Sequence, residues 1–414
     1  MKRIKFILVS LFLAVFAFSS CSDDDESSRT NFTPAEHKAE IRTILNDVIT
    51  QVKPEDHKDL LQVIAHFVSI SEGLEVLPQT DAQITSLLSA TKAVFEKNDF
   101  DKMTRAATNM VSLSMLNGIH NYDEATKTWK KTESQKGLEI NFTFNGKPAS
   151  LKLTPSEKTH ISSLNMKTPD DQIALDIVIP EKVNAVITLD KTTLLEMKGE
   201  FDINESLSVG KIKLELNANN YVAKLKLDAT PSHAELDLTA KIKGKEILDL
   251  DLEVNGENMT VAQEIVNALQ KDSDLELVKL FHNAKAELTI GDAIKLKGEC
   301  SNFTKVLEPL FREHGEYSRE NMLKDINDFI AAYNTYCKVD MYYTDGDNKI
   351  ASLSFKLLDD GEHPELEIYI DFVVDGSSEP IFEFFDEEFY GPLSETVGKL
   401  AAAYQEILKD YMGE

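Results

Sequence analysis

The sequence has few cysteines, a single tryptophan and no long apolar run after its first twenty residues. Its 414 residues include 3 cysteines and 1 tryptophan, Trp129. The apolar run at residues 6–18 is shorter than the roughly 20 residues that a membrane-spanning helix needs. Sugar-binding platforms usually expose tryptophan and tyrosine rings. The lone tryptophan therefore argues against a platform of that kind.

Sequence motifs of the common enzyme classes are also missing. The nine histidines never stand four residues apart, as the two ligands of a helical zinc-hydrolase site do. The chain has no G-x-S-x-G nucleophile motif, no phosphate-binding glycine loop and no dinucleotide-binding glycine motif. We therefore expect no enzyme, no metal and no cofactor.

Paired carboxylates are the catalytic candidates that remain. A glycosidase needs two carboxyl groups about 5 to 9 Å apart, one of them kept protonated by a dry pocket. Strand alternation instead predicts that the acidic groups face water, where a calcium site is a further alternative. Two sets share the polar face of a predicted strand: Glu365, Glu367 and Asp371 on one, and Asp249, Asp251 and Glu253 on another.

The chain is strongly acidic, with 44 Lys and Arg against 71 Asp and Glu and a net charge of −27. Loss of residues 1–20 would remove three further positive charges and give a net charge of −30. Nucleic-acid binding depends on clustered basic side chains that displace counterions. We therefore expect no nucleic-acid partner.

The N-terminus has the pattern of a secretory signal. Lys2, Arg3 and Lys5 precede the apolar run 6–18, and Ser19 and Ser20 lead to Cys21. This segment resembles the lipobox of bacterial lipoproteins, in which the cysteine becomes the lipidated first residue of the mature chain. Phe18 and Ser20 depart from the usual Leu and Gly or Ala of that motif.

The acidic run that follows Cys21, residues 23–26, is similar to the export signal of Bacteroidetes-type surface-exposed lipoproteins. The resemblance covers about the first 28 residues. It implies that residues 1–20 are a signal peptide, that Cys21 carries palmitate or similar acyl chains, and that residues 21–33 are an acidic tether. Each buried methylene of an acyl chain contributes about 0.8 kcal/mol, so several chains would fix the protein on a lipid bilayer. The implied location is the outer membrane, on the cell surface.

Residues 34–118 are predicted to be helical. Apolar residues recur at helical spacing from Ile41 to Val52, and Pro54 interrupts the pattern. A second helix is expected from Glu55 to about Glu72, and two more over 81–97 and 100–116. These helices are best explained as a small bundle or as a cover over a sheet.

From residue 119 to 256 the period of the pattern changes from 3.6 to 2. An Asn145-Gly146 pair separates two alternating runs, which is the strongest short-range signal of a hairpin. From Ile173 to Val254 Leu and Ile alternate with charged residues. Such strands have one wet and one buried face, as antiparallel sheets allow. We expect an antiparallel meander here, with its apolar side covered.

Residues 257–414 are predicted to mix helices and strands, continuous with the same sheet. Helices are expected over 258–270, 303–314, 318–333 and 392–412, and a hairpin around Gly291. The predicted fold class is α+β, with N-terminal helices packed against a long antiparallel meander, further helices, and a C-terminal helix. The length suggests two lobes, because single cores rarely grow beyond about 250 to 300 residues.

Four residues in this last section are candidate sites. Cys300 and Cys337 fall at predicted strand ends and are candidates for one disulfide in an oxidising extracytoplasmic compartment. Tyr343 and Tyr369 fall on predicted polar faces, and we interpret them as candidate ligand contacts.

The sequence thus favours a non-catalytic surface lipoprotein with a binding or structural role, whose ligand and protein partners it does not name. One alternative is a carrier for a lipid or another apolar ligand, held in a half-barrel cavity on the leucine-rich face. A second alternative is a glycan-acting hydrolase that uses paired carboxylates.

Overall fold

The computed structural model describes residues 29–71, 74, 117–134, 136–167, 172–206, 208–261, 264, 278–312, 318–345, 348–359 and 364–409. The signal peptide, Cys21 and the first part of the acidic tether lie outside these residues. The chain divides into two compact units. Unit 1 comprises residues 1–53, 232–259 and 268–404, and unit 2 comprises 54–231, 260–267 and 405–414. Each is described by itself.

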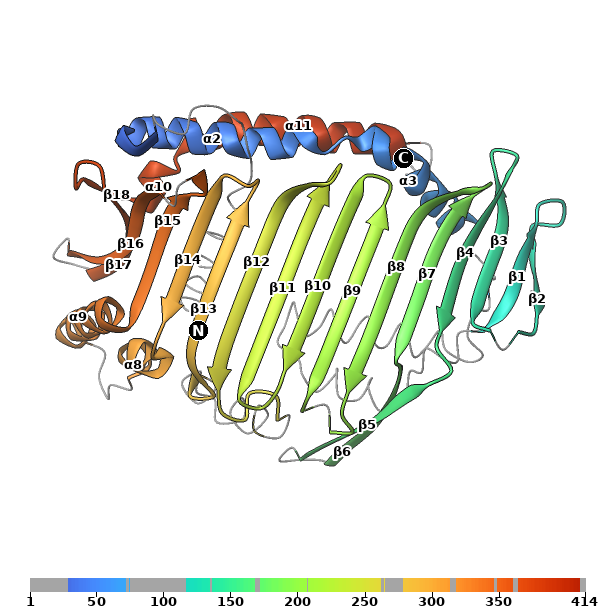
Figure 1. Cartoon of the computed structure of the whole chain (residues 1–414), viewed down its shortest axis with the longest axis horizontal. Coiled ribbons are helices and arrows are strands. Elements are labelled where there is room, and N and C mark those ends of the chain that lie inside the picture. The colour runs from blue at the N-terminus through green and yellow to red at the C-terminus, as the bar shows by residue number, and fades with distance from the viewer. Residues whose placement is uncertain are drawn as a thin grey trace. The chain divides into compact units, whose positions relative to one another are not determined.

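Unit 1 contains an antiparallel sheet of eight strands in the order β18-β17-β16-β15-β14-β13-β12-β11, which follows the chain (Figure 1). Because neighbouring strands follow one another directly, the unit is a meander. The sequence predicts a meander for residues 119–256 and, beyond them, a mixed section of helices and strands that continues the sheet. The strands of unit 1 are β11 (His233–Ile242), β12 (Lys245–Gly256), β13 (Phe281–Ile290), β14 (Ile294–Cys300), β15 (Cys337–Tyr343), β16 (Asn348–Asp359), β17 (Pro364–Phe372) and β18 (Ser378–Pro380).

Helices cover the apolar face of unit 1 at both ends of its strands (Figure 1). Helices α2 (Pro34–Gln51), α10 (Ile381–Phe384) and α11 (Glu387–Leu408) pack over one end, where Ile44, Ile294 and Met341 belong to the same buried cluster. Helices α8 (Phe303–Leu307) and α9 (Arg319–Tyr336), with the 3₁₀ turn Glu308–Phe311, pack over the other end.

Unit 2 contains a second set of eight strands, in the order β10-β9-β8-β7-β4-β3-β1-β2. Helix α3 (Pro54–Ile70) packs on this set through Val63, in one cluster with Phe142 and Leu194. The strands of the unit are β1 (Gly118–Asp123), β2 (Thr128–Thr132), β3 (Leu138–Phe144), β4 (Lys147–Pro155), β5 (Thr159–Lys167), β6 (Gln172–Pro180), β7 (Lys182–Leu189), β8 (Thr192–Ile203), β9 (Gly210–Ala218) and β10 (Tyr221–Ala229).

The expected α+β class is confirmed, with two N-terminal helices, two sets of eight largely antiparallel strands, further helices and a C-terminal helix. The predicted hairpin at Asn145-Gly146 is confirmed as well. Both residues have positive φ angles, 49° and 73°, which is the backbone that a two-residue type I′ turn requires. The turn at Gly291 joins β13 to β14 as predicted.

Two features of unit 2 correct the expectation of a purely antiparallel meander. Strand β1 pairs with β3 in parallel, because β2 folds back onto the outer edge of β1. Strands β5 and β6 leave the order and form a two-stranded sheet of their own, so that β4 pairs directly with β7.

The closing helix begins earlier than predicted, at Glu387 and not at Pro392. A proline inside a helix cannot donate a hydrogen bond to the carbonyl four residues before it. Here that carbonyl belongs to Glu388, and the guanidinium of Arg42 donates to it at 3.0 Å. Arg42 of α2 therefore satisfies the acceptor that Pro392 leaves open, and it ties α2 to α11.

The predicted helix at 303–314 divides into α8 and the 3₁₀ turn, and the one at 318–333 extends to Tyr336. The helices expected over 81–97 and 100–116, and most of that at 258–270, lie outside the described residues.

The alternation of apolar and charged side chains is confirmed in the long strands, but the apolar face is less covered than expected. Leu214, Leu225 and Leu238 are half-buried, and Leu216 is 36% exposed. Full burial occurs where the described helices pack on the strand ends.

The first described residue, Arg29, is fixed in unit 1. Its guanidinium lies 2.8 Å from Glu40 and 3.0 Å from Asp345, and its centre lies 5.3 Å from the Tyr343 ring centroid. His37 forms a 2.9 Å hydrogen bond with the Tyr343 hydroxyl. Burial lowers the pKa of His37 and raises that of Tyr343, so both are neutral at pH 7. This cluster attaches the start of α2 to β15.

Replacing a fully buried residue of α2 tests how much its packing stabilises unit 1. Ile44 has 0% exposure, so we expect Ile44→Ala to lower the free energy of unfolding by about 2–5 kcal/mol. Val397→Ala, at a residue 48% exposed on α11, should change it by less than about 0.5 kcal/mol. Urea unfolding followed by circular dichroism measures both. Equal effects of the two substitutions would contradict the packing described.

Candidate functional site

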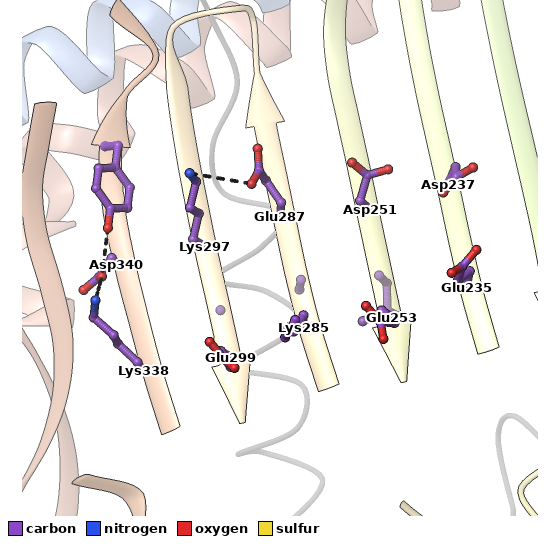
Figure 2. Close-up of a pocket in the computed structure, with 14 residues that line it drawn as sticks. Glu235, Asp237, Asp251, Glu253, Lys285, Glu287, Lys297, Glu299, Lys338 and Asp340 are labelled. Carbon is purple, nitrogen blue, oxygen red and sulfur yellow. Dashed lines mark hydrogen bonds and ion pairs between the residues drawn. The ribbon is translucent and has the colours of Figure 1, made fainter. Parts of the chain in front are cut away.

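Two hollows lie in unit 1, one on each face of its sheet. We call the first the polar groove; it has a volume of about 580 Å³ and is open to solvent on the charged face (Figure 2). Its lining is Glu235, Asp237, Asp251, Leu252, Glu253, Lys285, Ala286, Glu287, Lys297, Gly298, Glu299, Lys338, Asp340 and Tyr342.

Acidic residues dominate the β11 and β12 side of the polar groove. Glu235 stands opposite Glu253, and Asp237 stands opposite Asp251. Like charges directly opposite one another destabilise a strand pair by a few tenths of a kcal/mol or more. On the β13–β15 side, lysines alternate with the acids across the sheet, as Lys297 does between Glu287 and Asp340.

Asp340 is the most enclosed charge of the polar groove, at 2% exposure. Its carboxylate lies 2.7 Å from Lys338 and 2.8 Å from Lys349, and it accepts hydrogen bonds of 2.9 Å from Tyr342 and Ser352. Desolvation raises its pKa, but these four donors together outweigh that effect and lower the pKa to about 2. Asp340 is therefore a fully partnered structural carboxylate; Figure 2 shows its contact with Lys338.

The second hollow, which we call the apolar cavity, lies between the apolar face of the sheet and helices α8 and α9. Its volume is about 280 Å³. The side chains that line it are almost all apolar: Leu252, Ala284, Ala286, Cys300, Phe303, Val306, Leu307, Phe329, Tyr333, Cys337, Val339, Leu353, Phe355, Ile368 and Ile381, with Lys285, Gly298 and Glu299 completing the lining.

Small residues on two strands, β13 and β14, create the apolar cavity. Along β12 and β13 the inward positions at one end carry leucine, but Ala284 and Ala286 follow on β13, and Gly298 stands opposite Ala286 on β14. A Cβ atom built at Gly298 would come no closer than 3.9 Å to any neighbour. The side chains on this part of the sheet are therefore too small to fill the space beneath Phe329 and Val306.

Tyr333 supplies a polar atom at the edge of the apolar cavity. Its hydroxyl donates to the Leu353 carbonyl at 3.4 Å, and burial raises its pKa above the ordinary value. The ring packs edge-on against Phe355, with 4.6 Å between centroids. The tyrosine thus presents mainly ring carbons to the cavity.

The structure places the two candidate tyrosines differently. Tyr343 was expected on a polar face, but it shares its phase along β15 with Met341 and is 1% exposed, so that expectation is wrong. Its side chain belongs to the core beneath α2. Tyr369 does lie on the charged face and is half-buried, with the Lys356 ammonium 4.2 Å from its ring centroid. Its role as a ligand contact stays a prediction.

The carboxylates considered for catalysis are distributed along the charged face of unit 1. Glu365 is exposed, and Asp371 accepts a 2.5 Å hydrogen bond from Ser378. Burial, with Glu246 nearby, raises the pKa of Asp249, whereas Asp251 and Glu253 line the polar groove. No group of three or more His, Cys, Asp or Glu within the described part of the chain is placed to hold a metal ion.

Cys300 and Cys337 are brought together as cross-strand neighbours in β14 and β15. Both are thiols in the structure, so the disulfide stays a prediction. No helix among the described residues is long and apolar enough to cross a membrane.

The sequence did not single out Ala284, Ala286 and Gly298. Small residues at inward positions of alternating strands are nevertheless a signal that could have found the cavity.

Removing the charge of Asp340 tests its structural role. A folded-state pKa below the ordinary value stabilises the fold above about pH 4, and this contribution disappears as the pH falls through about 2. We expect Asp340→Asn to lower the free energy of unfolding by about 2 kcal/mol at pH 7, and the difference to shrink between about pH 4 and pH 2.

The exposed neighbour Glu299 supplies the control, because Glu299→Gln should change stability by less than about 0.5 kcal/mol. Urea unfolding at neutral and acid pH measures all three proteins. A difference between Asp340→Asn and the parent protein that does not depend on pH would contradict the assigned role.

Comparisons with known proteins give no family. No family model matches the chain, and a search of curated proteins found no match. Among solved structures, the chain is similar to a porin-like protein from Bacteroides vulgatus, with a TM-score of 0.17 and 6% sequence identity over 53% of this chain and 96% of that one. A likeness this slight assigns neither a fold nor a function.

Proposed function

We propose that the mature chain is a lipid-anchored lipoprotein of the outer-membrane surface whose unit 1 binds a small apolar ligand without catalysing a reaction. The apolar cavity between the sheet and helices α8 and α9 is the observation that carries this proposal. The sequence supports the anchor independently, through the lipobox-like segment that ends at Cys21 and the acidic run after it.

The size and lining of the apolar cavity define the ligand class. Its volume of about 280 Å³ approaches the roughly 300–1,000 Å³ of ordinary ligand pockets. An apolar cavity of about 150 Å³ engineered in another protein stays free of water and binds benzene. The larger cavity here therefore accommodates a compact hydrocarbon or part of one acyl chain. Contacts with such a ligand replace the dispersion contacts that the lining residues otherwise lack.

The ionisation and exposure of the carboxyl groups favour binding over catalysis. A glycosidase needs one carboxyl group kept protonated in a dry pocket beside a second carboxylate. In the polar groove the enclosed carboxylate, Asp340, is ionised and held by two lysines. Glu365 is exposed to solvent. These arrangements give no support to acid catalysis in the polar groove, and Asp249, whose pKa burial raises, does not line it. The paired-carboxylate hydrolase is therefore not proposed.

The anchor is tested by substitution of the modified cysteine. Cys21→Ser removes the thiol that acyl transfer requires, so we expect no incorporation of an alkyne-labelled fatty acid and loss of the protein from the membrane fraction. Cys300→Ser, far along the chain from the signal, is the matched control and should be labelled normally. Labelling of the Cys21→Ser chain would contradict the anchor.

The ligand is tested with the mature chain from Ser22 onward, which retains every described residue. We expect native mass spectrometry to detect a bound lipid, or titration with the uncharged fluorescent probe phenylnaphthylamine to show saturable binding. Gly298→Leu should fill the floor of the cavity and reduce probe affinity at least about tenfold, because each 1.4 kcal/mol of lost contact changes affinity by that factor.

Gly210→Leu is the control for this substitution. A Cβ atom at Gly210 meets its nearest neighbour at 3.9 Å, the same clearance as at Gly298, but Gly210 belongs to unit 2 and does not line the cavity. Circular dichroism verifies that both variants fold. A clean unliganded mass together with equal probe binding by parent, Gly298→Leu and Gly210→Leu would contradict the proposal.

A further inference from the structure

The two cysteines of unit 1 stand where the covering helices join the sheet. Cys300 is the last residue of β14, and Asn302, two residues later, is the N-cap of α8. Cys337 is the C-cap of α9 and the first residue of β15. The chain between them is therefore an excursion that leaves the sheet at one cysteine, forms α8 and α9, and returns at the other.

The register of β14 and β15 gives the two cysteines a backbone spacing that suits a disulfide. Cys300 stands directly opposite Cys337. The next pair carries a backbone hydrogen bond, in which Ser301 N–H donates to the Tyr336 carbonyl at 2.7 Å. Because hydrogen-bonded and non-hydrogen-bonded pairs alternate, the cysteines occupy a non-hydrogen-bonded pair, where Cα atoms are about 4.5 Å apart. Disulfides join Cα atoms about 4.4–6.8 Å apart.

We infer that Cys300 and Cys337 form a disulfide at the point where the chain leaves the sheet before α8 and rejoins it after α9. This bond holds the two helices over the apolar cavity. Both cysteines line that cavity, and Phe303, Val306, Phe329 and Tyr333 cover it from the two helices. A bond between these two residues therefore restrains α8 and α9 from separating from the sheet. The same bond should slow the exchange of a ligand held in the cavity. This consequence rests on the proposed function, whereas the bond itself does not.

The chemistry requires a two-electron oxidant, for which we name a low-molecular-weight disulfide. A hydrogen bond from Cys337 lowers the pKa of Cys300, so Cys300 forms the thiolate more readily. This thiolate attacks one sulfur of the oxidant and expels the other as a thiolate. Cys337 then loses its proton and attacks the Cys300 sulfur, which expels the second oxidant thiolate. The protein loses two hydrogens and the oxidant is reduced to two thiols.

The test compares reduced and oxidised mature chain from Ser22 onward, in which Cys300 and Cys337 are the remaining cysteines. After treatment with oxidised glutathione we expect a monomer that is lighter by two hydrogens and is not alkylated by iodoacetamide. Hydrogen exchange at amides of α8 and α9 should slow several-fold, with no change in β3 and β4 of unit 2. The double variant Cys300→Ser, Cys337→Ser should show neither effect.

Two results would overturn the inference. One is a pair of glutathione adducts or a disulfide-linked dimer in place of the internal bond. The other is an internal bond that leaves exchange in α8 and α9 unchanged. Dissociation of phenylnaphthylamine, measured in parallel, should be several-fold slower from the oxidised protein. If no probe binds to either form and the native mass shows no bound lipid, the proposed function fails, while the mass and exchange results still decide the disulfide.

Discussion

The structure depends on the division of each long strand into a charged face and an apolar face. In β13, for example, Lys285 and Glu287 face the charged side, while Ala284, Ala286 and Leu288 face the other. A sheet built in this way must cover its apolar face, because exposed leucines lose the free energy of burial, about 25 cal/mol per Å². In unit 1 this cover is supplied by α2, α10 and α11 at one end of the strands and by α8 and α9 at the other.

The two covers pack differently because the sheet beneath them differs. Under α2 the sheet presents large side chains such as Ile290 and Met341, and Ile44 is completely buried among them. Under α9 it presents Ala286 and Gly298, so Phe329 and Tyr333 close over a hollow. The proposed binding function thus depends on three small residues within an otherwise leucine-rich pattern, and the thiol pair stands at the edge of the same hollow.

Much of the fold could be predicted from the sequence because period and turn chemistry are local. The Asn145-Gly146 turn, the long alternating strands and the first two helices follow from patterns within a few residues. The parallel pairing of β1 with β3 could not be predicted, since it depends on how β2 folds back. At the start of α11, before Pro392, the Asp386 carboxylate accepts from the Phe389 N–H at 3.0 Å, and Arg42, more than three hundred residues away, donates to the Glu388 carbonyl that Pro392 leaves open. Tyr343 was assigned to the wrong face, although its phase with Met341 places it inside.

The most direct test of this account is a crystal structure of the mature chain under xenon pressure, because xenon enters apolar cavities that exclude water. The account predicts a xenon atom between Gly298 on the sheet and Phe329 on α9, with no ordered water beside it. A space filled by hydrogen-bonded waters, or closed by movement of α9 onto β14, would contradict the claim that small residues on the sheet leave a dry cavity for an apolar ligand.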